Sequence, residues 1–329
     1  MKIVSITTTR EAIPLKIPFI TALRTVHDAE FIRAKIVFDD GSESFGEAPA
    51  TKAITGEDLD SIEQNIAEVT PLLLGLDRAE ALLTLHDSSI GSSSKAALDM
   101  ALFSQEAIKD TEAIETDITI SLSDTNKMLL DAADAKAQGM KLFKVKLGND
   151  IKHAIEVTHL LAQEFEDRKL LIDANQAWSV AQSLEYIEGV KDLQTIELIE
   201  QPVIAKDLEG LKHISQNSPI PILADEAVFS FEDAKHVHQN NIAQMINIKL
   251  MKCGGVSKAV EILEYAREHN IVCMLGSMIE GPISINAAVQ LAFNYRDVIR
   301  YVDLDSPLLY KEPSELLSFR FDQGEVFVR

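Results

Sequence analysis

The chain has 329 residues and a mass of 36.3 kDa, so one large unit joined to a smaller one is expected. With 46% hydrophobic and 25% charged residues, its composition is that of a globular protein in water. The formal net charge of −21 argues against a nucleic-acid partner, because phosphate binding needs a basic surface.

The start of the chain has no basic stretch followed by an apolar core, so no secretory signal is expected. No apolar run approaches the roughly 18 residues that are needed to cross a bilayer. Cys253 and Cys273 are the only cysteines, which is typical of a reducing compartment, and the sequence has no zinc-binding pattern. We therefore expect a cytoplasmic protein without membrane contact.

The first hundred residues carry signals of strands followed by helices. Residues 3–15 alternate weakly between apolar and polar, as a strand does. Residues 31–38 and 43–46 flank the turn sequence DDGS and predict a β-hairpin. Helices are predicted at residues 57–74, 78–88 and 93–109. This order indicates an α+β domain, which we place at residues 1–112.

From about residue 115, short apolar runs alternate with amphipathic stretches. The runs predict strands at residues 116–121, 141–147, 169–174, 196–200, 220–225, 245–250, 272–277 and 299–304. Helices are predicted between them at residues 126–138, 151–166, 178–190, 206–216, 230–240, 255–269 and 282–294. The pattern predicts an α/β fold with a modified TIM barrel, (β/α)7β, at residues 113–306. The tail, residues 307–329, is expected to return to the N-terminal domain and complete it as a cap over the barrel.

Five charged residues each end one of these apolar runs: Lys146, Asp173, Glu200, Asp225 and Lys249. They follow one another at intervals of 24 to 27 residues, which is about the length of one βα unit. Because a barrel gathers the ends of its strands on one face, we expect all five side chains in one pocket. Three carboxylates between two lysines predict a metal-assisted proton-transfer site.

The types of these residues indicate their roles. Asp173, Glu200 and Asp225 offer hard oxygen ligands, which Mg²⁺ prefers, and Asn175 and Glu226 lie beside them as supports. Three intervening strands place Lys146 and Lys249 on opposite sides of the pocket, so one could remove a proton and the other return it. The sequence thereby favours epimerisation, provided that the pKa of each lysine is lowered.

Lys144 precedes Lys146 by two residues and faces the same side of its strand. We expect its charge to lower the pKa of Lys146 and to bind the substrate carboxylate. Lys252, just beyond the strand that ends at Lys249, is interpreted as structural or solvated.

Several of these segments, in this order and spacing, resemble those of one enzyme family. The segments FKVK, IDANQAW, IEQP, ADEA and INIKLMKCGG resemble the enolase superfamily, muconate lactonizing subgroup. Within it, TALRT, EAPATKAITG, TDITIS, GSMIEG and DLDSP are similar to dipeptide epimerases. The resemblance implies a Mg²⁺-dependent isomerase that converts L-Ala-L-Glu and L-Ala-D-Glu by two-base 1,1-proton transfer through an enediolate, in cell-wall peptide metabolism.

The resemblance also implies how a small dipeptide would be bound. Asp303 and Asp305 match the pair that holds the free α-ammonium group, and Thr119 matches a position that touches substrate. Arg24 matches the residue that pairs with the side-chain carboxylate of the second amino acid. Residues 54–56 resemble the tip of a lid loop, and residues 277–280 are expected to wall the substrate's first residue.

Other readings stay open. One is an epimerase for hydrophobic L-Ala-X dipeptides, and another is a lyase of the o-succinylbenzoate synthase or muconate cycloisomerase type. A third is a metal- or peptide-binding protein without catalysis. A homo-oligomer is also compatible with the sequence. The chain departs from the family in one place, because the connection between the N-terminal domain and the barrel is shortened to DTEAIE. This puts the packing of the cap on the barrel, or an oligomer contact, in question.

Overall fold

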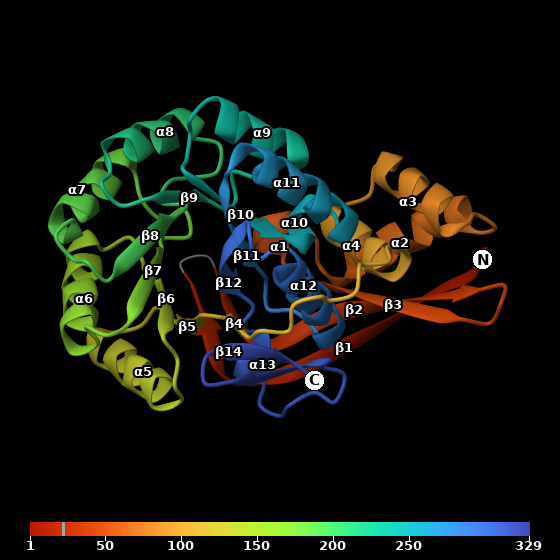
Figure 1. The fold of residues 1–329 in the computed structure, drawn as a ribbon, viewed down its shortest axis with the longest axis horizontal. Coiled ribbons are helices and arrows are strands. Elements are labelled where there is room, and N and C mark those ends of the chain that lie inside the picture. The colour runs from red at the N-terminus through yellow and green to blue at the C-terminus, as the bar shows by residue number, and fades with distance from the viewer. Residues whose placement is uncertain (22–23) are drawn as a thin grey trace.

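The computed structural model describes residues 1–21 and 24–329, and its eight parallel strands follow one another around a barrel in chain order (Figure 1). The strands are β5 (Ile118–Ile120), β6 (Leu142–Lys146), β7 (Lys169–Asp173), β8 (Ile196–Glu200), β9 (Ile222–Ala224), β10 (Met245–Lys249), β11 (Val272–Gly276) and β12 (Ile299–Asp303). The backbone N–H of Asp117 donates to the carbonyl of Val302 at 3.0 Å, which brings the two edges of the sheet together. The predicted barrel is therefore confirmed.

Helices follow the strands around the outside of the barrel (Figure 1). They are α5 (Thr125–Ala137), α6 (Ile151–Glu164), α7 (Val180–Val190), α8 (Leu208–Asn217), α9 (Phe231–Gln239), α11 (Val256–His269) and α12 (Pro282–Asn294). Two further helices are short. The helix α10 (Leu250–Cys253) begins directly after β10, and α13 (Ser306–Leu309) begins after a gap of two residues from the end of β12. The helix α13 was not predicted. Within the described part of the chain, no helix is long and apolar enough to cross a membrane.

The N-terminal domain packs a sheet against helices. Its antiparallel strands are β1 (Ile3–Ile20), β2 (Thr25–Phe38) and β3 (Glu43–Pro49), and its helices are α1 (Lys52–Thr55), α2 (Leu59–Leu73), α3 (Arg78–Asp87) and α4 (Ser92–Leu102). Alternate residues Ile32, Ala34 and Ile36 of β2 are buried in the core, as the period of a strand requires. The predicted α+β arrangement is therefore present.

The helix predicted at residues 93–109 was too long, because α4 ends at Leu102. The segment after it is held by the barrel instead of by its own hydrogen bonds. The side-chain amides of Gln290 and Asn294 on α12 donate to the carbonyl of Glu106 at 2.8 and 3.0 Å. Arg296 and Asp110 form an ion pair at 2.8 Å. The short connection thus packs the cap directly on the barrel.

The tail contacts both parts of the molecule. The backbone N–H of Lys311 donates to Pro14 of β1 at 2.7 Å, so the start of the tail lies against the cap. Beyond it, β13 (Phe319–Asp322) and β14 (Glu325–Val328) form a hairpin that pairs with β4 (Ile114–Glu115), just before the first barrel strand. The tail therefore ties the cap to the entry of the barrel.

Candidate active site

The strand register sets the predicted charged residues side by side at one end of the barrel. Lys146, Asp173 and Glu200 are direct neighbours across β6, β7 and β8. On the other side, Lys249 pairs with Gly276, and Gly276 pairs with Asp303 across β10, β11 and β12. Asp225 follows the last residue of β9. The regular spacing in the sequence therefore corresponds to one ring of strand ends.

An apolar layer fills the barrel below this ring. It consists of Leu142, Leu171, Leu198, Leu223, Met245, Met274 and Tyr301, which form one buried cluster. A second layer of inward-facing residues lies above the apolar one, each two positions later in the chain, as Asp173 follows Leu171 and Glu200 follows Leu198. Residues two apart on a strand face the same side, so apolar and charged layers share the barrel interior. The charged side chains therefore stand on a packed apolar layer.

Gly276 leaves space for the lysine beside it. A Cβ atom at this position would lie 3.0 Å from Cε of Lys249 and 2.8 Å from Oδ1 of Asn247. Any larger residue would displace the Lys249 side chain from its path into the pocket.

Ion pairs connect the lysines with the carboxylates. Nζ of Lys146 lies 2.6 Å from Oδ2 of Asp173, and Nζ of Lys249 lies 2.8 Å from Oδ2 of Asp225. Burial opposes the charge of Lys249, but Asp225 and its acidic neighbours raise its pKa above the ordinary value. The lowered pKa expected for a base is therefore absent from Lys249 as long as these carboxylates carry no cation.

Lys252 is buried, and its ammonium group donates to the carbonyl and to Oδ1 of Asp225, both at 2.5 Å, and to the carbonyl of Asn247 at 2.9 Å. It is structural and not solvated. Although burial opposes ionisation, Lys249 and Lys252 hold the pKa of Asp225 below its usual range.

Lys144 is fully buried in the barrel interior, with 0% of its side chain exposed. Its Nζ lies 2.5 Å from Asp303 and 2.7 Å from Glu200, so one ammonium group joins carboxylates from opposite parts of the ring. Burial opposes the charge, but Asp303, Glu200 and Asp173 together raise the pKa of Lys144 well above its usual range. This lysine is a permanent internal cation.

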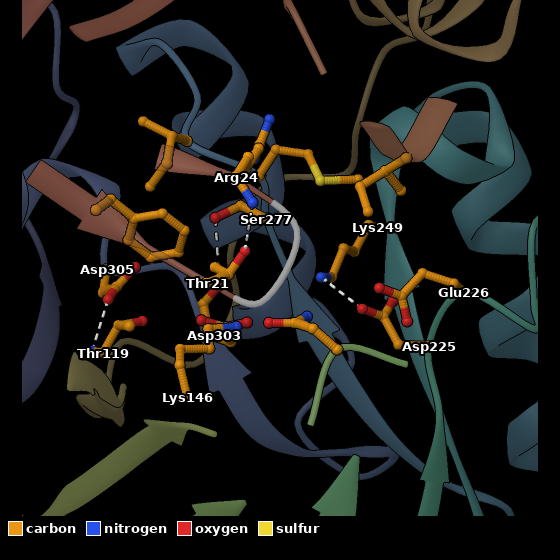
Figure 2. Close-up of a pocket in the computed structure, with 15 residues that line it drawn as sticks. Thr21, Arg24, Thr119, Lys146, Asp225, Glu226, Lys249, Ser277, Asp303 and Asp305 are labelled. Carbon is orange, nitrogen blue, oxygen red and sulfur yellow. Dashed lines mark hydrogen bonds and ion pairs between the residues drawn. The ribbon is translucent and has the colours of Figure 1, made fainter. Parts of the chain in front are cut away.

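A pocket opens above these residues, between the barrel and the cap (Figure 2). The cap contributes Phe19, Thr21, Arg24 and Ile54, and the barrel contributes Thr119, Lys146, Asn175, Asp225, Glu226, Lys249, Ser277, Met278, Ile279, Asp303 and Asp305. Seven of the ten predicted site residues are in this lining. The other three, Lys144, Asp173 and Glu200, are buried at the same strand ends.

The oxygen atoms around Asp225 fit a hard divalent cation. Side-chain oxygens of Asn175, Glu200, Glu226 and Asn247 are buried without a hydrogen-bond partner among the described residues, although Lys144 lies close to the one on Glu200. Burial and the neighbouring Asp173 raise the pKa of Glu200 to about 7, and burial and Asp225 raise that of Glu226 to about 8. A set of oxygen atoms from several neighbouring carboxyl and amide groups suits Mg²⁺.

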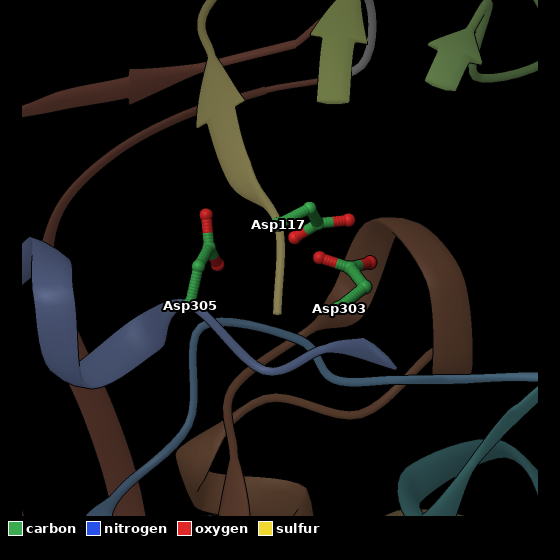
Figure 3. A group of neighbouring side chains, drawn as sticks. All are labelled: Asp117, Asp303 and Asp305. Atoms are coloured by element: carbon green, nitrogen blue, oxygen red, sulfur yellow. The ribbon is translucent and has the colours of Figure 1, made fainter. Parts of the chain in front are cut away.

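Asp117, Asp303 and Asp305 form a second group of neighbouring carboxylates (Figure 3), of which Asp303 and Asp305 line the pocket. Oδ2 of Asp305 accepts the backbone N–H of Thr119 at 2.8 Å, and burial beside Asp303 raises the pKa of Asp305 to about 6. Asp305 precedes the helix α13, but its side chain does not cap that helix. The three carboxylates favour a cationic group at this end of the pocket.

Asp117 was not among the site residues predicted from the sequence. Both of its carboxylate oxygens are buried and without a hydrogen-bond partner in the part of the chain that the structure describes. Burial, followed by repulsion from Asp303 and Asp305, raises its pKa well above the ordinary value. A signal was available, because Asp117 lies two residues before Thr119 and so faces the same side of the chain.

Arg24 lies at the cap side of the pocket, near Ser277 (Figure 2). Burial lowers the pKa of its guanidinium group, so it is not an ordinary surface arginine. The lid residue Ile54 lies in the one-turn helix α1, and Met278 and Ile279 line the pocket from the segment after β11. The part of the pocket wall around Arg24 is thus largely apolar.

The family follows from comparison with known proteins. Residues 3–113 match the mandelate racemase / muconate lactonizing enzyme N-terminal domain, and residues 127–329 match the enolase C-terminal domain-like family. The chain therefore belongs to the mandelate racemase / muconate lactonizing enzyme family of the enolase superfamily, which confirms the resemblance seen in the sequence. The L-amino acid-D/L-Glu epimerase of Sulfurimonas denitrificans is 54% identical, over 99% of both chains.

Solved structures agree with this relationship. A substrate-liganded complex of the L-Ala-D/L-Glu epimerase from Bacillus subtilis superposes with a TM-score of 0.92 at 36% identity, covering 100% of this chain and 97% of that one. The dipeptide epimerase from Enterococcus faecalis, complexed with Mg and L-Leu-L-Tyr, gives a TM-score of 0.90 at 29% identity, covering 100% and 98%. The whole chain, including cap and tail, therefore has the architecture of these enzymes.

Proposed function

We propose that this protein is a Mg²⁺-dependent dipeptide epimerase that interconverts L-Ala-L-Glu and L-Ala-D-Glu. The observation that carries the proposal is the placement of Lys146 and Lys249 on two sides of one pocket, with carboxylates between them (Figure 2). A carbon atom held between two such amines can lose its proton to one and regain it from the other. That exchange inverts the configuration at the α-carbon.

Asp173, Glu200 and Asp225 would hold the metal ion, with Asn175 and Glu226 beside it. When bound, Mg²⁺ would neutralise the charge that develops on the substrate carboxylate as the α-proton leaves and an enediolate forms. Two of these carboxylates, Asp225 and Glu200, raise the pKa of Lys249. Their neutralisation by a divalent cation therefore brings this lysine closer to the pKa that a base requires.

Recognition of the dipeptide would divide between barrel and cap. Asp303 and Asp305 would bind the α-ammonium group, and Thr119 lies beside them in the lining. Arg24 would pair with the carboxylate of a glutamate side chain. Because Lys144 lies under the pocket between Asp303 and Glu200, we assign it to the orientation of these carboxylates and not to direct contact with substrate.

Incubation with L-Ala-D-Glu and Mg²⁺ in deuterated water tests this function. Mass spectrometry and chiral chromatography should show one deuterium at the glutamate α-carbon and formation of L-Ala-L-Glu. If neither deuterium uptake nor the second diastereomer is detected, the proposal fails.

A second candidate is epimerisation of dipeptides whose second residue is hydrophobic. Phe19, Ile54, Met278 and Ile279 line the pocket around Arg24 and offer apolar surface to such a side chain. A library of L-Ala-X dipeptides, screened by mass increase in deuterated water, separates the two candidates. A lyase of the same superfamily is less well supported, because its substrates carry no ammonium group for Asp303 and Asp305.

We also propose how the chain is divided and where it acts. Residues 1–112 form the cap that selects substrate, residues 113–306 form the catalytic barrel, and residues 307–329 form the tail. We place its action in the cytoplasm, and the net charge of −21 disfavours a nucleic-acid partner. Recycling of cell-wall peptides, which contain alanine and glutamate, is the setting that we propose.

A further inference from the structure

Among the longer helices that surround the barrel, α5 to α9, α11 and α12, the last two begin without a capping side chain of their own. The helices α5 to α9 begin after Asp124, Asp150, Ser179, Asp207 and Ser230, and each of these side chains accepts a backbone N–H from the first turn. By contrast, α11 begins after Gly255 and α12 after Gly281, and neither position supplies a cap. The free N–H groups at a helix start need an acceptor from elsewhere.

Glu47 of the cap supplies this acceptor to α12. Its Oε2 accepts the backbone N–H groups of Ile283 and Ser284 at 2.8 and 3.2 Å. The carboxylate is fully buried, and Arg33 donates two hydrogen bonds to its Oε1 at 2.7 and 3.0 Å. A buried, charge-assisted contact of this kind holds the start of the helix in one place.

Asp99 of the cap does the same for α11. Its Oδ1 accepts the backbone N–H of Ser257 at 3.0 Å, and its Oδ2 accepts the hydroxyl group of the same serine. Nε2 of His86 lies 2.8 Å from Oδ2, so a second cap residue steadies the carboxylate.

The two glycines leave room for these foreign carboxylates. A Cβ atom at Gly281 would lie 2.5 Å from Oε2 of Glu47, and one at Gly255 would lie 2.4 Å from Cβ of Asp99. Real side chains do not approach so closely. A serine or aspartate at either position, the usual way to begin a helix, would therefore expel the cap residue.

We infer that Glu47 and Asp99 are positioning residues that dock the cap on the barrel by capping barrel helices across the domain boundary. Glu47 matters most for the pocket. It lies near the end of β3, the strand that leads to Ile54 in α1, and it holds the start of α12, which follows Ile279 closely in the chain. Ile54 and Ile279 face the pocket from opposite domains. Glu47 thereby sets the distance between the lid and the wall formed by residues 277–280.

Hydrogen exchange measured by mass spectrometry tests the contact directly, without any substrate. In Glu47→Ala, the peptide that contains Ile283 and Ser284 should exchange roughly tenfold faster, which is the scale of one lost N-cap. Glu47→Gln keeps an acceptor oxygen and should restore most of the protection. As a matched control, Ser230→Ala removes the ordinary cap of α9 and should leave this peptide unchanged. Unchanged exchange in Glu47→Ala would overturn the inference.

A double-mutant cycle with Gly281 provides an independent test. Gly281→Ala should destabilise the wild-type protein in a urea titration, because its methyl group meets the Glu47 carboxylate. In the Glu47→Ala background the same change should cost clearly less, so the two effects should not add. Additive losses would mean that the two residues do not share one space, and would refute the arrangement.

The third test rests on the proposed epimerase function. In Glu47→Ala, KM for L-Ala-D-Glu should rise roughly fivefold, whereas kcat should change less than about twofold, because the lysines and metal ligands are untouched. Ser230→Ala should lose stability without any change in KM. An equal KM for wild type and Glu47→Ala would contradict the positioning role. If the wild-type protein turns over no dipeptide, the proposed function fails, while the exchange and stability tests still decide this inference.

Discussion

Nζ of Lys249 lies 2.8 Å from Oδ2 of Asp225, so the expected second base is paired with an expected metal ligand. A cation on Asp225 must compete with this ammonium group. We therefore predict that Lys249→Ala binds Mg²⁺ more tightly than wild type, by roughly tenfold or about 1.4 kcal/mol. Isothermal titration calorimetry measures the difference.

The control for this prediction is Glu200→Gln, which removes a ligand charge and should weaken Mg²⁺ binding. Mg²⁺ at a hundred times its dissociation constant should also stabilise the wild-type protein by about 2.7 kcal/mol, and chelation by EDTA should remove both this gain and activity. Weaker binding by Lys249→Ala would show that Lys249 supports the metal site instead of competing with it.

Removal of either lysine should nearly abolish epimerisation. Each variant should still exchange the α-proton of one of the two diastereomers with solvent. General acid–base catalysis contributes about 10²- to 10⁴-fold, so Lys146→Ala and Lys249→Ala should each reduce conversion by roughly 10³-fold. Each variant retains one base. Each should therefore still exchange the α-proton of one diastereomer with deuterated water, and the two variants should prefer opposite diastereomers. Proton NMR follows both reactions, and conversion near the wild-type rate in either variant would exclude the two-base mechanism.

At acidic pH, the fall in kcat/KM should follow the protonation of Asp305. Burial beside Asp303 raises the pKa of this carboxyl group to about 6, so it loses its charge as the pH falls below that value. Because the charge binds the substrate ammonium group, kcat/KM at saturating Mg²⁺ should fall by up to about tenfold per pH unit below pH 6.

In Asp305→Asn, kcat/KM should be low at every pH, and the acid limb near pH 6 should disappear. A limb that persists unchanged in this variant would assign the titration to another group. Asp124→Asn, at the outer helix α5, serves as a control and should keep the wild-type profile.

Arg24 should determine whether the enzyme prefers dipeptides whose second residue is acidic or apolar. In Arg24→Met, which keeps the length of the side chain but removes its charge, kcat/KM for L-Ala-D-Glu should fall by roughly 100-fold, the scale of a charge-assisted hydrogen bond. Turnover of L-Ala-L-Leu should fall by no more than about threefold, because the apolar lining remains. A parallel loss for both dipeptides would show that Arg24 shapes the pocket and does not read the side chain.

The barrel and its ring of charged residues were predictable because both depend on local patterns. Several barrel strands combine a buried apolar run with a charged residue two positions after an inward-facing apolar one, as in Leu171 and Asp173. This period of two is visible in the sequence itself. Parallel pairing then places Lys146, Asp173 and Glu200 directly beside one another on three neighbouring strands.

Features that depend on distant contacts were not predictable in the same way. The helix beginning at Ser92 ended early because side chains of α12 bind the segment after it, and nothing near Leu102 in the sequence signals that contact. Glu47 reads as one more acidic residue on a strand, since its partner Ile283 lies 236 positions away. The burial of Asp117 likewise arises only when the first and last barrel strands meet.

The capping of α11 and α12 by the N-terminal domain also imposes an order on the assembly of the molecule. Glu47 and Asp99 leave the ribosome well before the helices whose starts they complete. The N-terminal domain is therefore made with two carboxylates whose partners in the barrel arrive only with the last third of the chain. A cap exchanged between relatives should fold on a new barrel only if the glutamate, the aspartate and the two receiving glycines are transferred as one set.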